Sequence, residues 1–160
     1  MFDINKDLID RWNHCLHQDT QAANLPIFEP FLFEFFQKAK ENNNLMFTHS
    51  DFQACVKKAE AVFVCVNTPP LQDEAREHLG QGTDMRAFNS VVRAVAEAAA
   101  GIMEAKDVAW PKILVNKSTV PVGTALATAQ IIERVLSAKT HVPVEDYFTI
   151  VSMPEFLAEG

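Results

Sequence analysis

Cysteine is scarce in this sequence, and its spacing shows no pattern of a stapled or metal-bound fold. The 160 residues include three cysteines, Cys15, Cys55 and Cys65, an odd number with no C-x-x-C pair. This argues against a disulfide framework and against a zinc site, and we predict no metal. Cys65 lies inside the apolar run AVFVCV, so we expect it to pack as a small hydrophobic residue.

Long hydrophobic runs and basic clusters are also missing. No apolar run reaches membrane-spanning length, and the first residues do not have the pattern of a signal peptide. A cytoplasmic location is therefore expected. The formal net charge is −7, which argues against nucleic acid and anionic membrane as partners. A small anionic ligand could still bind through helix N-termini and backbone amides.

Short apolar runs alternate with helical patterns in the remaining sequence. The spacing predicts strands at 45–49, 61–67, 112–118 and 147–152, and helices at 6–13, 30–41, 50–60, 84–104 and 123–139. The polar residues 14–24 are expected to form a loop or a fraying helix end. The continuous apolar run at 61–67 is typical of a strand covered on both faces. This alternation predicts a doubly wound α/β fold with a parallel sheet.

Polar or acidic residues follow the predicted strands, and doubly wound sheets bind ligands at that edge. MFDIN resembles the tail of a strand that ends in Asp3, an acid that could bind an adenosine ribose and favour NAD over NADP. VNTPP, KSTVPVGT and SMPEFLAEG follow the next strands. Each segment alone could be an ordinary loop. In the same way, the role of Glu155 and Glu159 could be limited to capping a following helix. Together they favour a cofactor crevice.

These motifs resemble those of the nucleotide-sugar 6-dehydrogenases, the UDP-glucose/GDP-mannose dehydrogenase family. The matching pieces are DIN, RWN, LPIFEP, VFVCVNTP, KSTVPVGT and PEFLAEG, in the family's order along essentially the whole chain. The resemblance implies an oxidoreductase that uses NAD to convert UDP-glucose to UDP-glucuronate. In this family a cysteine traps the aldehyde, and water then hydrolyses the thioester.

The resemblance also implies roles for individual residues. Asp3 would bind the adenosine ribose, and the cofactor would further contact Val66, Asn67, Thr68, Pro69, Ser118, Thr119 and Glu159. Glu155 and Thr119 would be catalytic, with Glu155 as the general base or acid of the hydrolytic half of the reaction. The sugar nucleotide would lie against Glu155, Phe156, Leu157, Ala158 and Glu159.

The sequence departs from the family pattern at its start. A dinucleotide fold opens with a strand and a G-x-G-x-x-G turn, and the ribose acid follows about 20 residues later. Here that acid is Asp3. We therefore interpret residues 1–160 as a partial NAD-binding domain, from the end of the second strand to PEFLAEG. The fold class expected is an incomplete Rossmann-like doubly wound parallel sheet that lacks the first strand and the glycine-rich turn. The central helical and sugar-nucleotide domains of the family are expected to be absent from residues 1–160.

Several consequences are expected from this interpretation. Because the missing strand is central in such a sheet, the chain should have unpaired strand edges and should be marginally stable or prone to aggregation. The chain alone is expected to be inactive, whereas the whole enzyme is expected to be a homo-oligomer. Two alternatives remain: a sister dehydrogenase of GDP-mannose or UDP-N-acetylmannosamine, and a non-catalytic truncated paralogue that binds full-length subunits.

Overall fold

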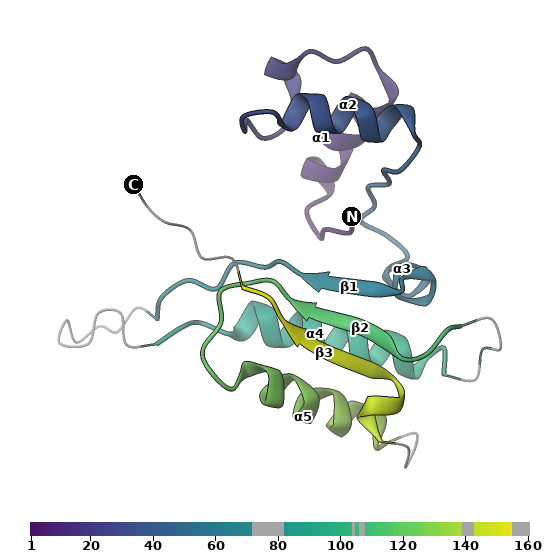
Figure 1. The fold of residues 1–160 in the computed structure, drawn as a ribbon, viewed down its shortest axis with the longest axis vertical. Helices are drawn as coiled ribbons and strands as arrows, with labels where there is room; N and C mark the ends of the chain where they lie inside the picture. The colour runs from purple at the N-terminus through teal and green to yellow at the C-terminus, as the bar shows by residue number, and fades with distance from the viewer. Residues whose placement is uncertain (72–81, 104, 106–107, 139–142, 155–160) are drawn as a thin grey trace. The chain divides into compact units, whose positions relative to one another are not determined.

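The computed structural model describes residues 1–71, 82–103, 105, 108–138 and 143–154 (Figure 1). The chain divides into two compact units, Met1–Phe52 and Gln53–Gly160. Among the described residues, no helix is both long enough and apolar enough to cross a membrane.

The first helix of the N-terminal unit, α1, spans Lys6–His17. Asn5 caps the start of this helix, because its side-chain oxygen accepts a hydrogen bond from the Leu8 N–H at 3.0 Å. Asparagine is one of the preferred residues at this position. The helix was predicted to end at residue 13, but it continues to His17. The reason is Cys15, which is buried and extends the apolar face of the helix beyond the predicted end.

The second α-helix, α2, spans Leu32–Glu41 and follows a short 3₁₀ helix, η1, at Ala22–Asn24. It was predicted to begin at Pro30, but Phe31 interrupts the helical backbone with a φ of 64° and a ψ of −1°. The two α-helices bury a common core made of Trp12, Cys15, Leu25 and Phe36.

Two extended segments of this unit pair in parallel at one position. Phe2 is bridged to Thr48, the Asp3 N–H donates to the Thr48 carbonyl at 3.1 Å, and the Thr48 N–H donates to the Met1 carbonyl at 3.0 Å. The predicted strand at 45–49 and the predicted strand tail before Asp3 are therefore present only as this isolated bridge.

The C-terminal unit contains a three-stranded parallel sheet in the order β1-β2-β3 (Figure 1). The strands are β1 Ala61–Val64, β2 Lys112–Asn116 and β3 Phe148–Ser152. All three strands run in the same direction, and the element order gives helices between them. This confirms the predicted α/β class with a parallel, Rossmann-like sheet.

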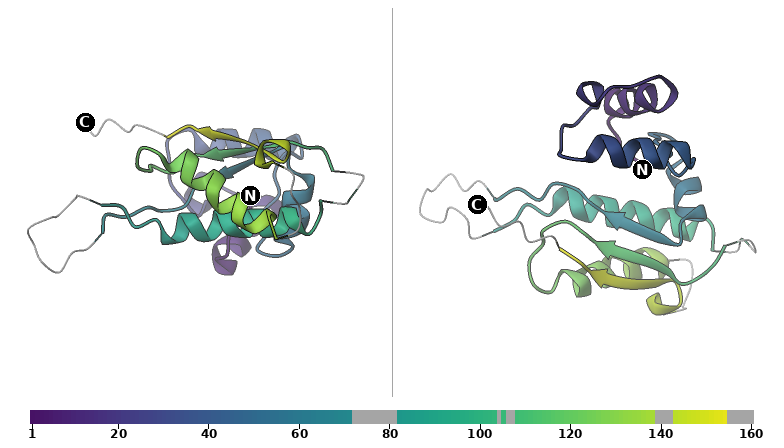
Figure 2. Two further views of the ribbon diagram at one scale, coloured as in Figure 1. Left: turned by 90° about the horizontal axis from the view of Figure 1, so that it is seen from below. Right: turned by 45° about the horizontal axis from the view of Figure 1, so that its top comes forward.

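Helices pack on one face of this sheet. They are α4, Arg86–Ala100, and α5, Thr124–Leu136, which contact each other (Figures 1 and 2). The unit also contains all of α3, Phe52–Lys58, except its first residue, and a 3₁₀ helix, η3, at Val144–Asp146. The buried side chains of the sheet and the two long helices include Val64, Phe88, Val92, Val95, Leu114, Ile132, Leu136 and Phe148.

The other face of the sheet is apolar but open within the part of the chain that the structure describes. Phe63, Ile113 and Val151 are 54%, 43% and 36% exposed. The prediction of a strand at 61–67 covered on both faces was therefore wrong, because β1 ends at Val64 and its outer face is exposed. Among the described residues β1 pairs only with β2, so an open sheet edge is present as expected. Marginal stability stays a prediction.

Phe31 combines a left-handed backbone with an exposed ring, being 73% accessible to solvent. A side chain disfavours this backbone region, whereas glycine adopts it readily. The substitution Phe31→Gly should therefore raise the free energy of unfolding by about 1 kcal/mol in urea denaturation. The control Phe35→Gly removes an equally exposed ring from inside α2 and should lower that free energy. Destabilisation by both substitutions would contradict the account of Phe31.

Lys112 is a buried cation at the start of β2, with only 2% of its surface exposed. Its ammonium donates to the carbonyl of Lys57 at 3.0 Å and to that of Ala59 at 2.7 Å, at the end of α3. It also lies 5.2 Å from the ring centre of Trp110. Burial lowers the pKa of Lys112 below its ordinary value of 10.5, although the charge of Glu60 acts in the opposite direction.

This shift predicts a pH dependence of stability. Below pH 10.5 the unfolded state binds more protons at Lys112 than the folded state, so the free energy of unfolding should rise with pH. The free energy of unfolding of the natural chain minus that of Lys112→Met should therefore increase from pH 7 to pH 10. The exposed, non-ionisable Thr149 provides the control Thr149→Val, for which the difference should stay constant. If this difference stays constant or decreases with pH for Lys112→Met, the prediction is refuted.

Candidate functional site

The carboxyl ends of the three strands meet at one edge of the sheet. The register pairs Val64 of β1 with Asn116 of β2, and Asn116 with Ser152 of β3. The polar segments that follow β1 and β2 therefore start side by side, as Figure 1 shows at the arrowheads. Just past β3, the Met153 N–H donates to the Asn116 carbonyl at 3.0 Å.

The segment after β2 is tied to the segment after β1 by its first residues. The N–H groups of Lys117 and Ser118 both donate to the Val64 carbonyl, at 3.0 and 3.1 Å. The Ser118 hydroxyl donates to the Val66 carbonyl at 2.7 Å. Val66 and Ser118, two predicted cofactor-binding residues far apart in the sequence, are thus brought together.

A second contact joins Thr68 to Thr119. The Thr68 hydroxyl donates to the Thr119 carbonyl at 2.7 Å. Beyond it the chain is paired again, because the Asp84 N–H donates to the Pro69 carbonyl at 2.8 Å and the Leu71 N–H donates to the Gly82 carbonyl at 2.9 Å. The stretch from Val66 to Pro69 is therefore held at both of its ends.

Several donors at this edge remain available. Among the described residues, the N–H groups of Thr68, Thr119 and Val120 donate to no acceptor, and the exposed Thr119 hydroxyl has no partner. Shortly afterwards α5 begins behind Gly123, whose φ of 87° suits glycine. Within the described part of the chain, no side chain caps this helix. Free amides next to a helix N-terminus are suited to bind an anionic or hydroxyl-rich ligand.

Asn116 is a residue of this region that sequence reasoning missed. It is fully buried at the end of β2, and its side-chain amide donates to the buried Thr128 hydroxyl of α5 at 3.3 Å. Its side-chain carbonyl oxygen has no partner in the described part of the chain. The signal in the sequence is a polar residue that closes the apolar run KILVN. This contact attaches the end of β2 to α5.

Asp3 belongs to the other compact unit. Its carboxylate accepts a hydrogen bond from the Asn5 N–H at 2.8 Å, just before α1. Lys6, the basic residue nearest to it in the sequence, forms an ion pair with Asp10 one helical turn further on. Asp3 and the edge of the three-stranded sheet therefore belong to different units.

Cys65 does not pack as expected, because it is exposed after the end of β1. Partial desolvation raises the pKa of its thiol, although the nearby charge of Lys117 acts to lower it. A thiol with a raised pKa is mostly protonated at neutral pH and is a weak nucleophile. No group of three metal-binding side chains occurs among the described residues.

The predicted residues of the last motif lie outside the described part of the chain. They are Glu155, Phe156, Leu157, Ala158 and Glu159. Asn67 lies in the described segment after β1, is exposed, and makes no side-chain hydrogen bond to any other described residue.

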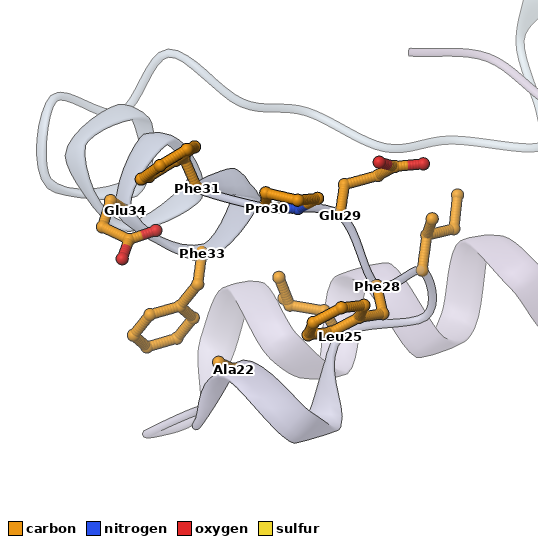
Figure 3. Close-up of a pocket in the computed structure, with 9 residues that line it drawn as sticks. Ala22, Leu25, Phe28, Glu29, Pro30, Phe31, Phe33 and Glu34 are labelled. Carbon is orange, nitrogen blue, oxygen red and sulfur yellow. The ribbon is translucent and has the colours of Figure 1, made fainter. Parts of the chain in front are cut away.

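A small hollow lies in the N-terminal unit, between η1 and the start of α2 (Figure 3). It is lined by Ala22, Leu25, Ile27, Phe28, Glu29, Pro30, Phe31, Phe33 and Glu34. Its volume is about 160 Å³, well below the 300–1,000 Å³ of ordinary ligand pockets. Its charged groups are two carboxylates, so it is unsuited to a phosphorylated ligand.

Comparison with known proteins gives one consistent relationship. The sequence profile described as UDP-glucose/GDP-mannose dehydrogenase family, NAD binding domain, matches residues 1–160. UDP-glucose 6-dehydrogenase 3 of Oryza sativa subsp. japonica is 36% identical over 160 residues, which cover 99% of this chain and 27% of the rice protein. UDP-glucose 6-dehydrogenase of Caenorhabditis elegans is 33% identical over 158 residues, which cover 99% of this chain and 28% of its own length.

A solved structure supports the same fold. The NDP-N-acetyl-D-galactosaminuronic acid dehydrogenase from Methanosarcina mazei Go1 superposes with a TM-score of 0.65 at 19% identity, over 98% of this chain and 29% of that protein. The chain thus spans little more than a quarter of the length of the curated relatives named above. The family profile, the two relatives and the parallel sheet with its motif-bearing edge agree: the chain belongs to the UDP-glucose/GDP-mannose dehydrogenase family, through its NAD-binding domain.

Proposed function

We propose that this chain binds NAD at the carboxyl edge of its three-stranded sheet, as part of an enzyme that oxidises UDP-glucose to UDP-glucuronate. One observation carries the proposal. The segments after β1 and β2 are joined by hydrogen bonds between their own groups, while the N–H groups of Thr68, Thr119 and Val120 donate to no acceptor among the described residues. In this proposal residues 1–160 form a partial NAD-binding domain.

The donors at this edge fit the chemistry of the cofactor. A dinucleotide offers a pyrophosphate and ribose hydroxyls, which accept hydrogen bonds from backbone N–H groups and from a helix N-terminus. The edge supplies both through the free amides and the uncapped start of α5 at Thr124. The absence of a basic cluster is therefore no obstacle to binding. When bound, NAD supplies the nicotinamide ring that accepts a hydride.

The chain's own residues then have separate tasks. The Thr119 hydroxyl is free to donate to the cofactor or to a reacting oxygen, since it has no partner within the described residues. Val66, Asn67, Thr68, Pro69 and Ser118 shape the wall along which the cofactor lies. Asp3 is assigned to the adenosine ribose by resemblance alone.

The last motif completes the proposed site. Glu155 acts as the general base that takes a proton from attacking water, and Glu159 contacts the nicotinamide side. Phe156, Leu157 and Ala158 lie along the sugar nucleotide. The proposal also includes a homo-oligomeric enzyme in the cytoplasm. The net charge of −7 supports the absence of nucleic acid and anionic membranes among its partners.

Titration calorimetry of the 160-residue chain with NAD⁺ tests the cofactor assignment. We expect saturable binding, and a dissociation constant about fivefold higher for Thr119→Val, because one hydrogen bond of about 1 kcal/mol is lost. The control Thr149→Val changes an exposed threonine of β3 whose hydroxyl has no partner among the described residues, and it should bind as the natural chain does. Absence of binding by a folded chain, or equal affinity of Thr119→Val, would contradict the proposal.

A further inference from the structure

Two hydroxyl protons at the sheet edge are already engaged within the protein. Ser118, after β2, donates its proton to the carbonyl of Val66, after β1, and the Val64 carbonyl of β1 is a longer second acceptor at 3.3 Å. Thr68, after β1, donates its proton to the carbonyl of Thr119, after β2. Each of the bonds to Val66 and Thr119 has an oxygen–oxygen distance of 2.7 Å, which is the usual length of a good O–H···O hydrogen bond.

The two bonds are reciprocal, because each segment gives one hydroxyl proton to the other. Ser118 is only 6% exposed, and its N–H is also bonded to Val64, so its half of the pair is shielded from water. Thr68 is half-buried, and its bond links residues 51 positions apart in the sequence. Separating the segments would break both bonds, whereas the sheet register alone fixes only their starting points.

We propose that Thr68 and Ser118 are positioning residues that form a clasp between the two segments, and that they do not recognise the cofactor through their hydroxyl protons. This inference rests on the proposed binding of NAD at this edge. The clasp holds the Thr119 carbonyl, and with it the free N–H groups of Thr119 and Val120 and the Thr119 hydroxyl, in the conformation that binds.

The chemistry of the cofactor sharpens this assignment. The phosphate oxygens of a dinucleotide can only accept hydrogen bonds, and a hydroxyl whose proton is engaged can only offer lone pairs. While the clasp is closed, Thr68 and Ser118 therefore cannot donate to the pyrophosphate. The hydrogen bonds to the pyrophosphate are then donated by the Thr119 hydroxyl and by backbone N–H groups. The sequence predicted only that Thr68, Ser118 and Thr119 bind the cofactor, without distinguishing their hydroxyls.

Hydrogen exchange of the ligand-free chain tests the clasp. The probe is the Ser118 N–H, which is protected by its bond to Val64 and adjoins Thr119. In Thr68→Val its exchange should become about fivefold faster, the factor that corresponds to losing one hydrogen bond of about 1 kcal/mol. Thr68→Ser retains the hydroxyl and should restore the natural rate, and the control Thr149→Val should leave that rate unchanged. Ser118→Ala should speed exchange at the Lys117 N–H in the same way.

The affinity for NAD⁺ separates positioning from direct contact. The clasp predicts that Thr68→Val weakens binding by about the same factor as it speeds exchange, with rescue by Thr68→Ser. Weaker binding with unchanged exchange in the ligand-free chain would show that Thr68 contacts the cofactor directly, and would overturn the inference. Unchanged exchange and unchanged affinity would also overturn it. If the natural chain binds no NAD⁺, the proposed function fails, and the exchange rates alone still decide whether the clasp exists.

Discussion

The pairing of β2 with a parallel strand on each side is the constraint on which the C-terminal unit depends. Lys112, Leu114, Val115 and Asn116, which make up most of β2, are buried, so the strand has a strong preference for this central place. Parallel pairing in register brings the carboxyl ends of neighbouring strands to one edge. The polar segments after β1 and β2, which are separated by the whole of α4, start side by side for that reason.

The edge shows how an acidic protein can be suited to an anionic ligand. The chain has a net charge of −7, yet the groups presented at the edge are backbone N–H groups and the neutral hydroxyl of Thr119. Such donors act at short range and need no surrounding positive field. Their value depends on being held in place, so the hydrogen bonds between the two segments matter as much as the free donors themselves.

Two predicted segments were confirmed as central elements of the C-terminal unit. KILVN and the alanine-rich segment at 84–104 became β2 and α4, because their burial agrees with their local preference. Element ends were less predictable. The end of α1 depends on the burial of Cys15, and the start of α2 depends on the backbone of Phe31.

The candidate site was predictable in its location and less so in its detail. The motifs VNTPP and KSTVPVGT lie where the strand order requires. Which hydroxyl is free and which is engaged depends on distances between segments that no spacing in the sequence encodes. The same holds for the contact between Asn116 and Thr128, which pairs a strand end with the middle of a helix.

Amide chemical-shift mapping of the isotope-labelled 160-residue chain during titration with NAD⁺ tests the central claim most directly. The account predicts that shifts concentrate on the unused amides of Thr68, Thr119 and Val120 and on the first turn of α5. Shifts confined to the hollow around Phe28 and Phe33 in the N-terminal unit, with the sheet edge unchanged, would contradict it.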